Sequence, residues 1–593
     1  FFGSDVTQLE YTLILKKKRT RLYRMSSNEQ FPDYIRITSK NNISGITKVK
    51  HEDLTPLQDE MTVSIDFGST HTTVGFSQEN QPPQEMNFSE SPPLIIADGP
   101  VPGALLEYFV PDGLLSEPPK TLSIYQQLKK VWSPFRTIWR HYPGTGNEFL
   151  SRGNIPICLT PEFVFEPDND IKESLKWDSK ADYRDGFLEQ LIIMVLVECE
   201  AMGVNNAELR WSYPRSFSTK EQNSMHRFFE RMQERYGLNG GDFRIKINPR
   251  GFSEAISAMD YFIHHESEFT TRNLVASIDV GGGTSDITFI KDRAILWEDS
   301  VKFGGDDIKN SLHHIKKLIN TYRAKNHQKT FPTPFDYSKF ISTWPGISSD
   351  WDGQMDDFIH EGSADSNLFF HKLGLFYSAC FYYLGMHLKR KEFEAPLHMI
   401  SLAGNGTQFL RVVSHGGPVN SENASAWYDL FKGVLSDAQG IPDISYTNST
   451  ILFSADPKKE VAYGMIYSKQ NNLDGVRPEK VEKMIGLNCV INGNNYEWLN
   501  PIPPHTCAEI DTSKIDYTQF MHFLNSFYDR IQTSEMAEYM AVKNLATEVS
   551  DADLASFQNE ISNYLERRSE DELATPLFFL AVKVWIDRLE KLV

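Results

Sequence analysis

Three short turns that contain glycine carry the residues that could bind a phosphorylated ligand. The first follows the segment TVSIDF (62–67), whose alternating apolar residues predict a buried strand with Asp66 at its end. Gly68, Ser69 and Thr70 come next and turn the chain, so that backbone amides and hydroxyls face outward. Such a concave group of N–H donors suits an anion. We therefore predict that this first turn (residues 68–70) binds phosphate.

The segment LVASIDVGGGTSDITFI (274–290) repeats the design, with an apolar strand, Asp279, a second turn (residues 281–284) and another apolar strand. Consecutive glycines let backbone N–H groups approach an anion with no Cβ in the way. The carboxylates of Asp66 and Asp279 could hold Mg²⁺ through its water ligands. The repetition indicates two duplicated lobes. The residues that we expect at the phosphates from this turn are Gly281, Gly282, Gly283 and Thr284.

The segment APLHMISLAGNGTQF (395–409) also ends a buried strand in small residues. We name Gly404, Asn405 and Gly406 the third turn (residues 404–406), where a nucleoside could lie against bare backbone. The three turns together predict a cleft that binds a Mg-nucleotide.

The length of the chain and the pattern of its apolar residues indicate which elements position these turns. A chain of 593 residues exceeds the size of one hydrophobic core, so several domains are expected. From Met61, short β-branched runs alternate with amphipathic helices, which is typical of an α/β fold. The expected parts are an N-terminal appendage of strands and loops (1–60), a nucleotide-binding domain (61–470) and a mostly helical C-terminal module (471–593). Within the domain we expect lobe I at about 61–272 and 450–470, and lobe II at about 273–449.

Composition excludes several classes of partner. The net charge of −19 disfavours attraction to nucleic acid or to an anionic membrane surface. The longest apolar run, at 191–197, is too short to span a bilayer. The five cysteines form no CxxC pair, which favours neither a disulfide framework nor a zinc module. We therefore expect a cytoplasmic protein with neither a nucleic-acid nor a membrane partner.

In order and spacing, these segments resemble the actin-like ATPase superfamily, and most closely the nucleotide-binding domains of DnaK-type heat-shock chaperones. Further segments carry the resemblance across most of residues 61–470. They are WSYPRSFSTKEQNSMHRFF (211–229), INPRGFSEAISAMDYF (247–262), VKFGGDDIKNSL (301–312) and DPKKEVAYGMIY (456–467). The resemblance implies an α/β, two-lobed actin-like fold built from duplicated ribonuclease H-like lobes.

The resemblance also implies roles for single residues. Asp66 and Asp279 would hold hydrated Mg²⁺, and Glu254 would help to position the attacking water. The predicted catalytic residues are Asp66, Glu254, Asp279 and Thr284. The predicted nucleotide-binding residues are Gly68, Ser69, Thr70, Gly281, Gly282, Gly283, Gly305, Gly404, Asn405 and Gly406. Such a site works by positioning and electrostatics.

The sequence departs from the family pattern at several positions. His71 stands where the family usually has Tyr, Gln408 where it has an Arg beside the base, and Lys458 where it has an Asp. These departures leave adenine and guanine both open. The catalytic lysine of the first lobe also has several candidates, namely Lys120, Lys129, Lys172 and Lys176.

The function that the resemblance implies is a nucleotide-gated conformational switch, which hydrolyses ATP to ADP with Mg²⁺ and acts on a protein partner or within a larger assembly. No segment after residue 470 resembles the β-sandwich peptide-binding domain of the chaperones, so client folding is not expected. Two alternatives remain open. One is a small-molecule kinase on the same fold, and the other is a nucleotide-binding scaffold or filament protein with little hydrolysis.

Overall fold

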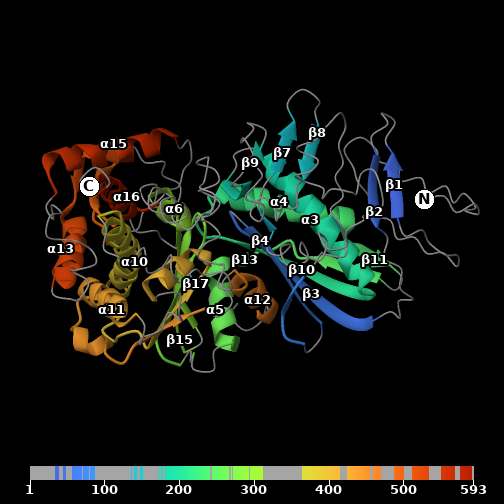
Figure 1. Ribbon diagram of the computed structural model, residues 1–593, viewed down its shortest axis with the longest axis horizontal. Helices are drawn as coiled ribbons and strands as arrows, with labels where there is room; N and C mark the ends of the chain where they lie inside the picture. Colours follow the sequence, from blue (N-terminus) through green and yellow to red (C-terminus); the bar gives the residue numbers. More distant parts are fainter. Residues whose placement is uncertain are drawn as a thin grey trace, which may run out of the picture.

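Two large sheets organise the chain, which is described by a computed structural model (Figure 1). The residues that the structure describes are 34–38, 44–48, 57–69, 71–78, 81–86, 135–136, 139–142, 147–150, 171–172, 175–177, 181–240, 243–265, 269, 272–292, 294–311, 364–414, 424–454, 458–468, 486–499, 510–532, 549–567 and 575–589.

The first sheet is built around β3, the strand that carries Asp66. Its strand order is β11-β12-β10-β3-β4-β5, with β13 beside β10 and β6 beside β4. β3 and β4 form an antiparallel pair with Asp66 opposite Thr73, whereas β10 runs parallel to both β3 and β12. The strands are β3 (Leu57–Phe67), β4 (His71–Gln78), β5 (Gln84–Glu85), β6 (Phe135–Arg136), β10 (Val204–Tyr213), β11 (Leu238–Gly240), β12 (Phe243–Ile247) and β13 (Phe252–Ser253).

The second sheet is built around β14, the strand that carries Asp279. Every residue of β14 is buried, as expected for a central strand covered on both faces. β14 pairs antiparallel with β15 and parallel with β17, and β17 pairs parallel with β18. The strands, in sheet order, are β16 (Ala294–Val301), β15 (Ser285–Lys291), β14 (Val275–Val280), β17 (Met399–Ala403) and β18 (Thr450–Phe453).

The two sheets repeat one strand order. β5-β4-β3-β10-β12 in the first corresponds to β16-β15-β14-β17-β18 in the second, with the same parallel and antiparallel pairings. The long helices also alternate with the last strands in the same chain order. The first set is α3 (Ala181–Ala201), α4 (Thr219–Tyr236) and α5 (Glu254–His265), and the second is α10 (Ala364–Arg390), α11 (Ser425–Gln439) and α12 (Glu460–Tyr467). The predicted α/β class is confirmed.

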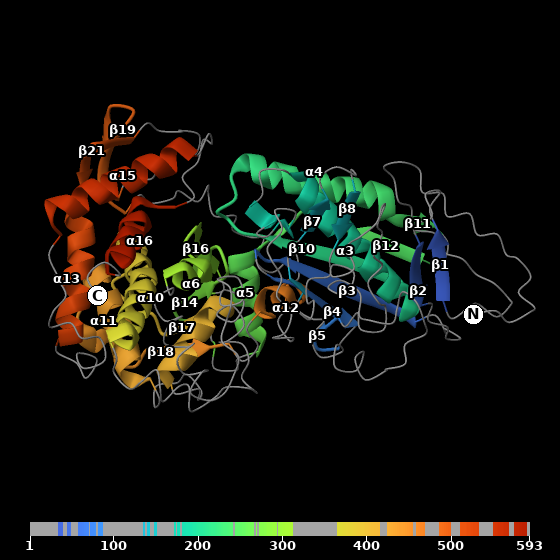
Figure 2. The same cartoon turned by 45° about the horizontal axis from the view of Figure 1, so that its top comes forward.

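The last helix of each set packs against the other set. α5 and α12 contact each other, α5 also contacts β14 and β15, and α12 contacts β3 and β4. Their apolar residues form a separate core cluster that includes Tyr261, Phe262 and Met465, and Figure 2 shows both helices between the two sheets. Two helices therefore join the sheets at their centre.

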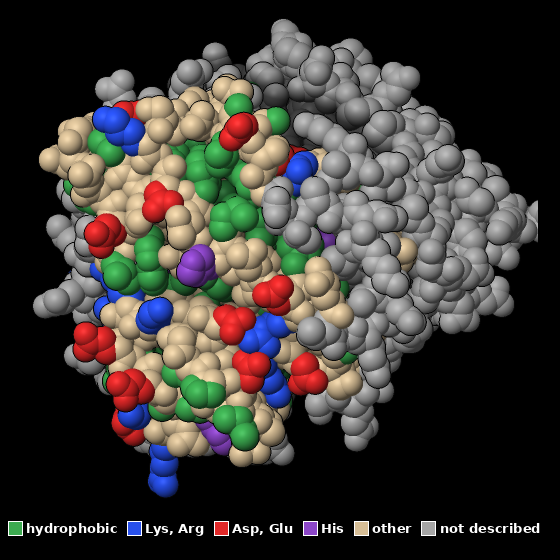
Figure 3. Space-filling view, turned by 90° about the vertical axis from the view of Figure 1, so that its left-hand side faces the viewer, with side chains coloured by type: hydrophobic (Ala, Val, Ile, Leu, Met, Phe, Trp, Pro, Cys, Tyr) green, Lys and Arg blue, Asp and Glu red, His purple; other side chains and the backbone are tan. Residues whose placement is uncertain are grey.

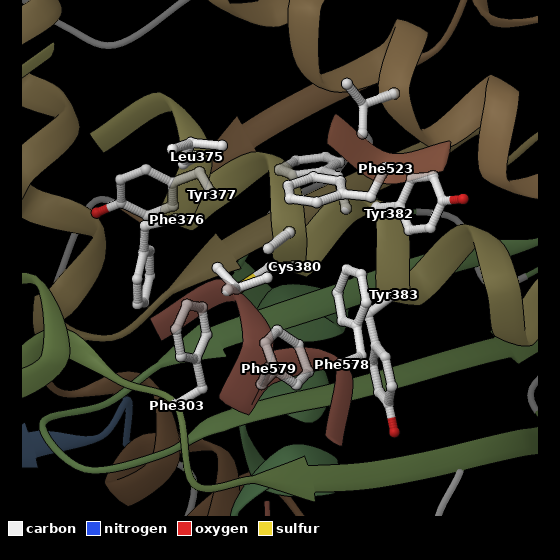
Figure 4. Packing of buried hydrophobic residues seen from close by; sticks show 14 of the residues in the cluster. Phe303, Leu375, Phe376, Tyr377, Cys380, Tyr382, Tyr383, Phe523, Phe578 and Phe579 are labelled. Carbon is white, nitrogen blue, oxygen red and sulfur yellow. The ribbon is translucent and has the colours of Figure 1, made fainter. Parts of the chain in front are cut away.

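The C-terminal segment shares a core with the second sheet. Phe578 and Phe579 from α16 lie against Tyr382 and Tyr383 of α10, and Phe579 also lies against Phe303 (Figure 4). One hydrophobic cluster accordingly runs from the second sheet to the end of the described chain. The segment contains α13 (Thr518–Gln532), α15 (Asp551–Arg567), α16 (Leu577–Leu589) and a sheet of β20 (Asn494–Tyr496), β19 (Asn488–Ile491) and β21 (Ile510–Asp516).

The structure corrects details of the expected organisation. β18 belongs to the second sheet, although residues 450–470 were assigned to lobe I, because its backbone pairs with β17. β3 begins at Leu57, inside the expected appendage, where β1 (Tyr34–Thr38) and β2 (Ser44–Lys48) form an antiparallel pair. The expected module at 471–593 has no core of its own among its described residues. The domain limits otherwise stay predictions.

The remaining elements are small. Strands β8 (Asn147–Leu150), β7 (Trp139–Tyr142) and β9 (Ile171–Lys172) form a sheet, and the short helices are η2 (Leu175–Trp177), α6 (Gly305–Ser311), η4 (Asn405–Ser414) and η5 (Asp443–Tyr446). Among the described helices, none combines the length and the apolar character that a membrane crossing requires.

Candidate functional site

The first and second turns face each other although they are distant in sequence. A Cβ built on Gly283 would lie 2.9 Å from Trp177 Nε1 and 3.1 Å from Ser69 Oγ. Trp177 Nε1 in turn donates a hydrogen bond of 2.8 Å to Ser69 Oγ. Because Gly283 has no Cβ, the indole of Trp177 and the hydroxyl of Ser69 can both approach the second turn at this point.

Asp66 and Asp279 occupy equivalent positions in the two sheets. Each is the last residue but one of the first strand of its sheet, and each is less than a tenth exposed. Ser212 Oγ, at the end of the neighbouring strand β10, donates a hydrogen bond of 3.1 Å to Asp66 Oδ1. Asp279 stands opposite Asp286 across the β14–β15 pair. The repeated strand order thus places one carboxylate beside each turn.

A buried ion pair joins Lys176 to Glu254, the first residue of α5. Lys176 Nζ lies 2.7 Å from Glu254 Oε1 and 2.9 Å from Glu254 Oε2, and both side chains are less than a tenth exposed. Burial raises the pKa of Glu254 to about 8 against the lowering effect of Lys176. Burial alone would lower the pKa of Lys176, but the charges of Glu254 and Asp66 outweigh it and raise that pKa.

Lys176 is one of the four lysines that the sequence left as candidates, and the only one whose side chain the structure describes. Lys120 and Lys129 lie outside the described residues, and for Lys172 only the backbone, in β9, is described.

The site holds more buried acidic side chains than basic ones. Burial raises the pKa of Asp279 well above its usual range, and the carboxylates of Glu460, Asp286, Asp66 and Glu254 raise it further. Burial likewise raises the pKa of Asp286 to about 6, and it raises that of Asp66 despite the nearby charges of Lys176 and Lys458. Like charges in a buried place are costly unless a counter-charge joins them. The cluster therefore favours a bound cation.

The donor set fits Mg²⁺ held through water. Carboxylate oxygens are the ligands that hard divalent cations prefer, and Mg²⁺ commonly keeps several waters while contacting one or two carboxylates and the substrate phosphates. Among the described residues, no group of three or more His, Cys, Asp or Glu is placed to hold a metal ion directly. An ion that met Asp66 and Asp279 through its waters would satisfy both observations.

The third turn lies against Asp279. Gly404 has a φ of +80°, and a Cβ at this position would be 2.1 Å from Asp279 Oδ1. Its N–H donates a hydrogen bond of 3.2 Å to Oε1 of Glu460, the first residue of α12. A Cβ on Gly406 would lie 2.7 Å from Val280 O, and Asn405 begins η4. The third turn therefore needs glycine at positions 404 and 406, where it lies against the end of β14.

Residues 304–306, at the start of α6, pack against the backbone of the second turn. The N–H of Gly305 donates to Gly281 O at 2.8 Å, and the N–H of Asp306 donates to Gly282 O at 2.7 Å. A Cβ on Gly304 would be 2.6 Å from the backbone N of Thr284. These contacts fix the path of the second turn.

The structure brings most of the predicted site residues together. Direct contacts link the first, second and third turns, Asp279 and Gly305, while Asp66 and Glu254 join this group through Lys176. Thr70 lies outside the described residues. Gly68, Gly282 and Asn405 belong to the same turns. The catalytic and binding roles of all these residues stay predictions.

Three residues of the cluster were not among the predicted site residues, and a fourth, Lys176, was only one of four candidate lysines. Asp286 stands within the second glycine segment itself, so the sequence offered a signal for it. Glu460 corresponds to Glu254, because each is the first residue of the last helix of its set. Only the repeated order of strands and helices reveals this correspondence. Lys176 and Trp177 stand in η2 with no motif to distinguish them.

Comparison with known proteins gives only distant likenesses. No protein-family model and no curated protein matches the chain. MreB5 of Spiroplasma citri bound to ADP is 13% identical with a TM-score of 0.27, over 48% of this chain and 63% of that chain, which is less than two thirds of its length. The same protein bound to AMPPNP is 10% identical with a TM-score of 0.32, over 69% of this chain and 96% of that chain. Scores this low assign no fold.

Proposed function

We propose that the chain is a Mg-nucleotide-binding ATPase of the actin-like type, closest to DnaK-type nucleotide-binding domains, which acts as a conformational switch. The observation that carries the proposal is the meeting of the two glycine turns. Each follows an Asp at the same position of a repeated sheet, and Ser69 of one lies beside Gly283 of the other. A nucleotide with its phosphates between the turns would contact both halves of the chain at once.

The proposed two-lobed fold has support from the repeated order of strands and helices. Lobe I would be centred on the first sheet and lobe II on the second. Because α5 and α12 join the two sheets, they are the natural hinge for lobe closure. Binding energy from phosphate contacts to both turns would then favour the closed arrangement.

The proposed chemistry assigns a task to each charged group. Asp66 and Asp279 would hold the waters of Mg²⁺. The N–H groups of the second turn other than that of Gly281, which donates to Thr284 O at 2.8 Å, would contact the terminal phosphate. A bound Mg²⁺ would supply charge stabilisation to the phosphoryl oxygens. Lys176 adds positive charge on the side of the first turn. Glu254 orients the attacking water. Burial raises its pKa to about 8, so the carboxylate that can accept the proton of that water forms increasingly as the pH rises through 8.

The proposed switch would act on a protein partner or within a larger assembly, in the cytoplasm. Its cofactors would be ATP and ADP with Mg²⁺, and a guanine nucleotide is the alternative. The buried free thiols of Cys199, Cys380 and Cys489 suit a reducing compartment.

The test is γ-phosphate release from Mg-ATP and Mg-GTP by the purified chain, with candidate small acceptors present. The variant is Asp66→Asn with Asp279→Asn, which keeps the shape of both side chains while removing their charge. Asp551→Asn, an exposed residue at the start of α15, is the matched control. We expect release by the unaltered chain and the control, and at least a hundredfold loss in the double variant, the order that removing one key electrostatic group costs elsewhere.

Other outcomes would replace the proposal. Transfer of phosphate to an acceptor would identify a small-molecule kinase. Tight binding without turnover, together with nucleotide-dependent light scattering, would identify a scaffold or filament protein. Equal release by the double variant and the control would contradict the assigned site.

A further inference from the structure

The C-terminal helix α16 contacts the segment that supports the second turn. Lys583 Nζ lies 2.8 Å from Asp307 Oδ1 and donates a hydrogen bond of 2.9 Å to Lys302 O. Thr575 Oγ1 donates to the same carbonyl at 3.3 Å. The rings of Phe579 and Phe303 lie side by side (Figure 4), with their centroids 4.6 Å apart. One ion pair, two hydrogen bonds and one ring contact therefore dock α16, with Thr575 just before it, onto residues 302–307.

Those residues hold the second turn on their other side. The second oxygen of Asp307, Oδ2, accepts a hydrogen bond of 2.9 Å from the N–H of Gly304. Gly304 in turn touches the backbone of Thr284, and Ser285 Oγ donates to Phe303 O at 2.5 Å. The carboxylate of Asp307 thus connects Lys583 of α16 with the backbone that supports the second turn.

A second route leads from the same segment to the first turn. Lys302 Nζ lies 5.1 Å from the centroid of the Trp177 ring, within the range of a cation–π contact. Trp177 donates to Ser69 Oγ. Lys302 therefore joins α16, through its carbonyl, to the indole that stands between the two turns.

We propose that Lys583 is a positioning residue of the nucleotide site, through which the C-terminal segment sets the affinity for the phosphates. The inference rests on the proposed function, because it concerns the regulation of the same site. It also explains why residues beyond the expected nucleotide-binding domain share a core with the second sheet. Anything that lifted α16 from residues 302–307 would loosen the second turn and weaken phosphate binding.

The outer face of this end of the molecule mixes charged, polar and apolar side chains (Figure 3). The contacts that carry the connection lie instead on the inner side of α16, against residues 302–307.

The experiment compares Lys583→Met with Arg588→Met in the full chain. Arg588 lies on the same helix, and its Nε pairs with Asp553 Oδ1 at 2.6 Å, which ties α16 to α15 instead of to the second turn. Dissociation constants are measured for Mg-ADP and, by competition, for adenosine, with the guanine pair used if phosphate release selects guanine. The nucleoside lacks the phosphates that the second turn would contact.

We expect Lys583→Met to weaken Mg-ADP binding about fivefold, the equivalent of a partly exposed ion pair, and to leave adenosine binding unchanged. Arg588→Met should change neither, and Lys583→Arg should restore most of the affinity. In an Asp307→Asn background, Lys583→Met should have a smaller effect, because the two residues act through one contact.

The results separate this inference from the proposed function. If the unaltered chain binds neither Mg-ADP nor Mg-GDP, both are overturned. If it binds nucleotide, but Lys583→Met matches Arg588→Met or weakens nucleoside and nucleotide equally, only the positioning role is overturned.

Discussion

Replacing Gly404 by alanine should disturb the site in two separable ways. The residue has a φ of +80°, a region in which an L-residue pays roughly 1–2 kcal/mol. The new Cβ would also lie 2.1 Å from Asp279 Oδ1 and 2.5 Å from Val280 O, so something buried must move. Forced overlap in a packed interior costs about 1–3 kcal/mol. We expect Gly404→Ala to lower the free energy of unfolding by roughly 2–5 kcal/mol in total.

Two other glycines provide matched controls. Gly440 has a φ of +81°, and a Cβ there would find no atom nearer than Lys389 Nζ, at 3.6 Å. Gly493 has a φ of +78° with nothing within 4 Å. Alanine at either position pays the backbone cost alone, roughly 1–2 kcal/mol. The excess loss in Gly404→Ala therefore measures the clash beside Asp279.

The assay is urea denaturation of the three variants, followed by circular dichroism, together with Mg-nucleotide binding. Gly404→Ala should unfold at the lowest urea concentration. It should also bind nucleotide about tenfold more weakly or worse, because displacing the Asp279 carboxylate need weaken the binding free energy by only about 1.4 kcal/mol to have that effect. The controls should bind as the unaltered chain does. Equal destabilisation of all three variants, or unchanged binding in Gly404→Ala, would refute the reasoning.

Three further predictions concern polar groups that are buried or partly buried. Lys176→Met leaves Glu254 buried without its partner and should cost about 3–5 kcal/mol in urea denaturation, with partial recovery in the double variant that adds Glu254→Gln; no recovery would contradict the pairing. Burial raises the pKa of Asp260 from 3.8 to about 7, against a hydrogen bond from Ser468. Between these values the folded chain holds a proton that the unfolded chain has lost, so this group makes stability fall as pH rises, by up to about 4 kcal/mol. Asp260→Asn should therefore gain stability relative to the unaltered chain at pH 8 but not at pH 3.5, and parallel pH profiles would contradict this. Trp177→Phe removes the 2.8 Å indole hydrogen bond, at a cost of about 1 kcal/mol, and should weaken nucleotide binding about fivefold without changing the fold in circular dichroism.

The strands and turns of the candidate site could be predicted because their signals are local. Alternation of apolar residues marks β3 and β14, and each strand has an Asp as its last residue but one and is followed directly by glycine. A strand has a period of two and glycine relaxes the backbone, so a few consecutive residues suffice to specify a strand and the turn that follows it. The α/β class followed from the same patterns.

The partners of those turns could not be predicted in the same way. Lys176 meets Glu254 across 78 positions of the chain, and Trp177 meets Ser69 across 108. Neither contact has a sequence pattern, because side chains brought together by separate elements need no fixed spacing. The four candidate lysines were equivalent until the fold placed one of them in the cluster.

The sequence by itself determined the local parts of this protein, namely strand ends that carry Asp66 and Asp279, the bare backbone that follows them, and the amphipathic helices. Tertiary structure alone decided that β18 joins the second sheet, that Lys176 lies near both Asp66 and Asp286, and that Lys583 of α16 pairs with Asp307 in the segment that supports the second turn. The physical reason is that backbone conformation responds to neighbouring residues, whereas burial, charge clustering and docking depend on which distant surfaces the packed core brings together.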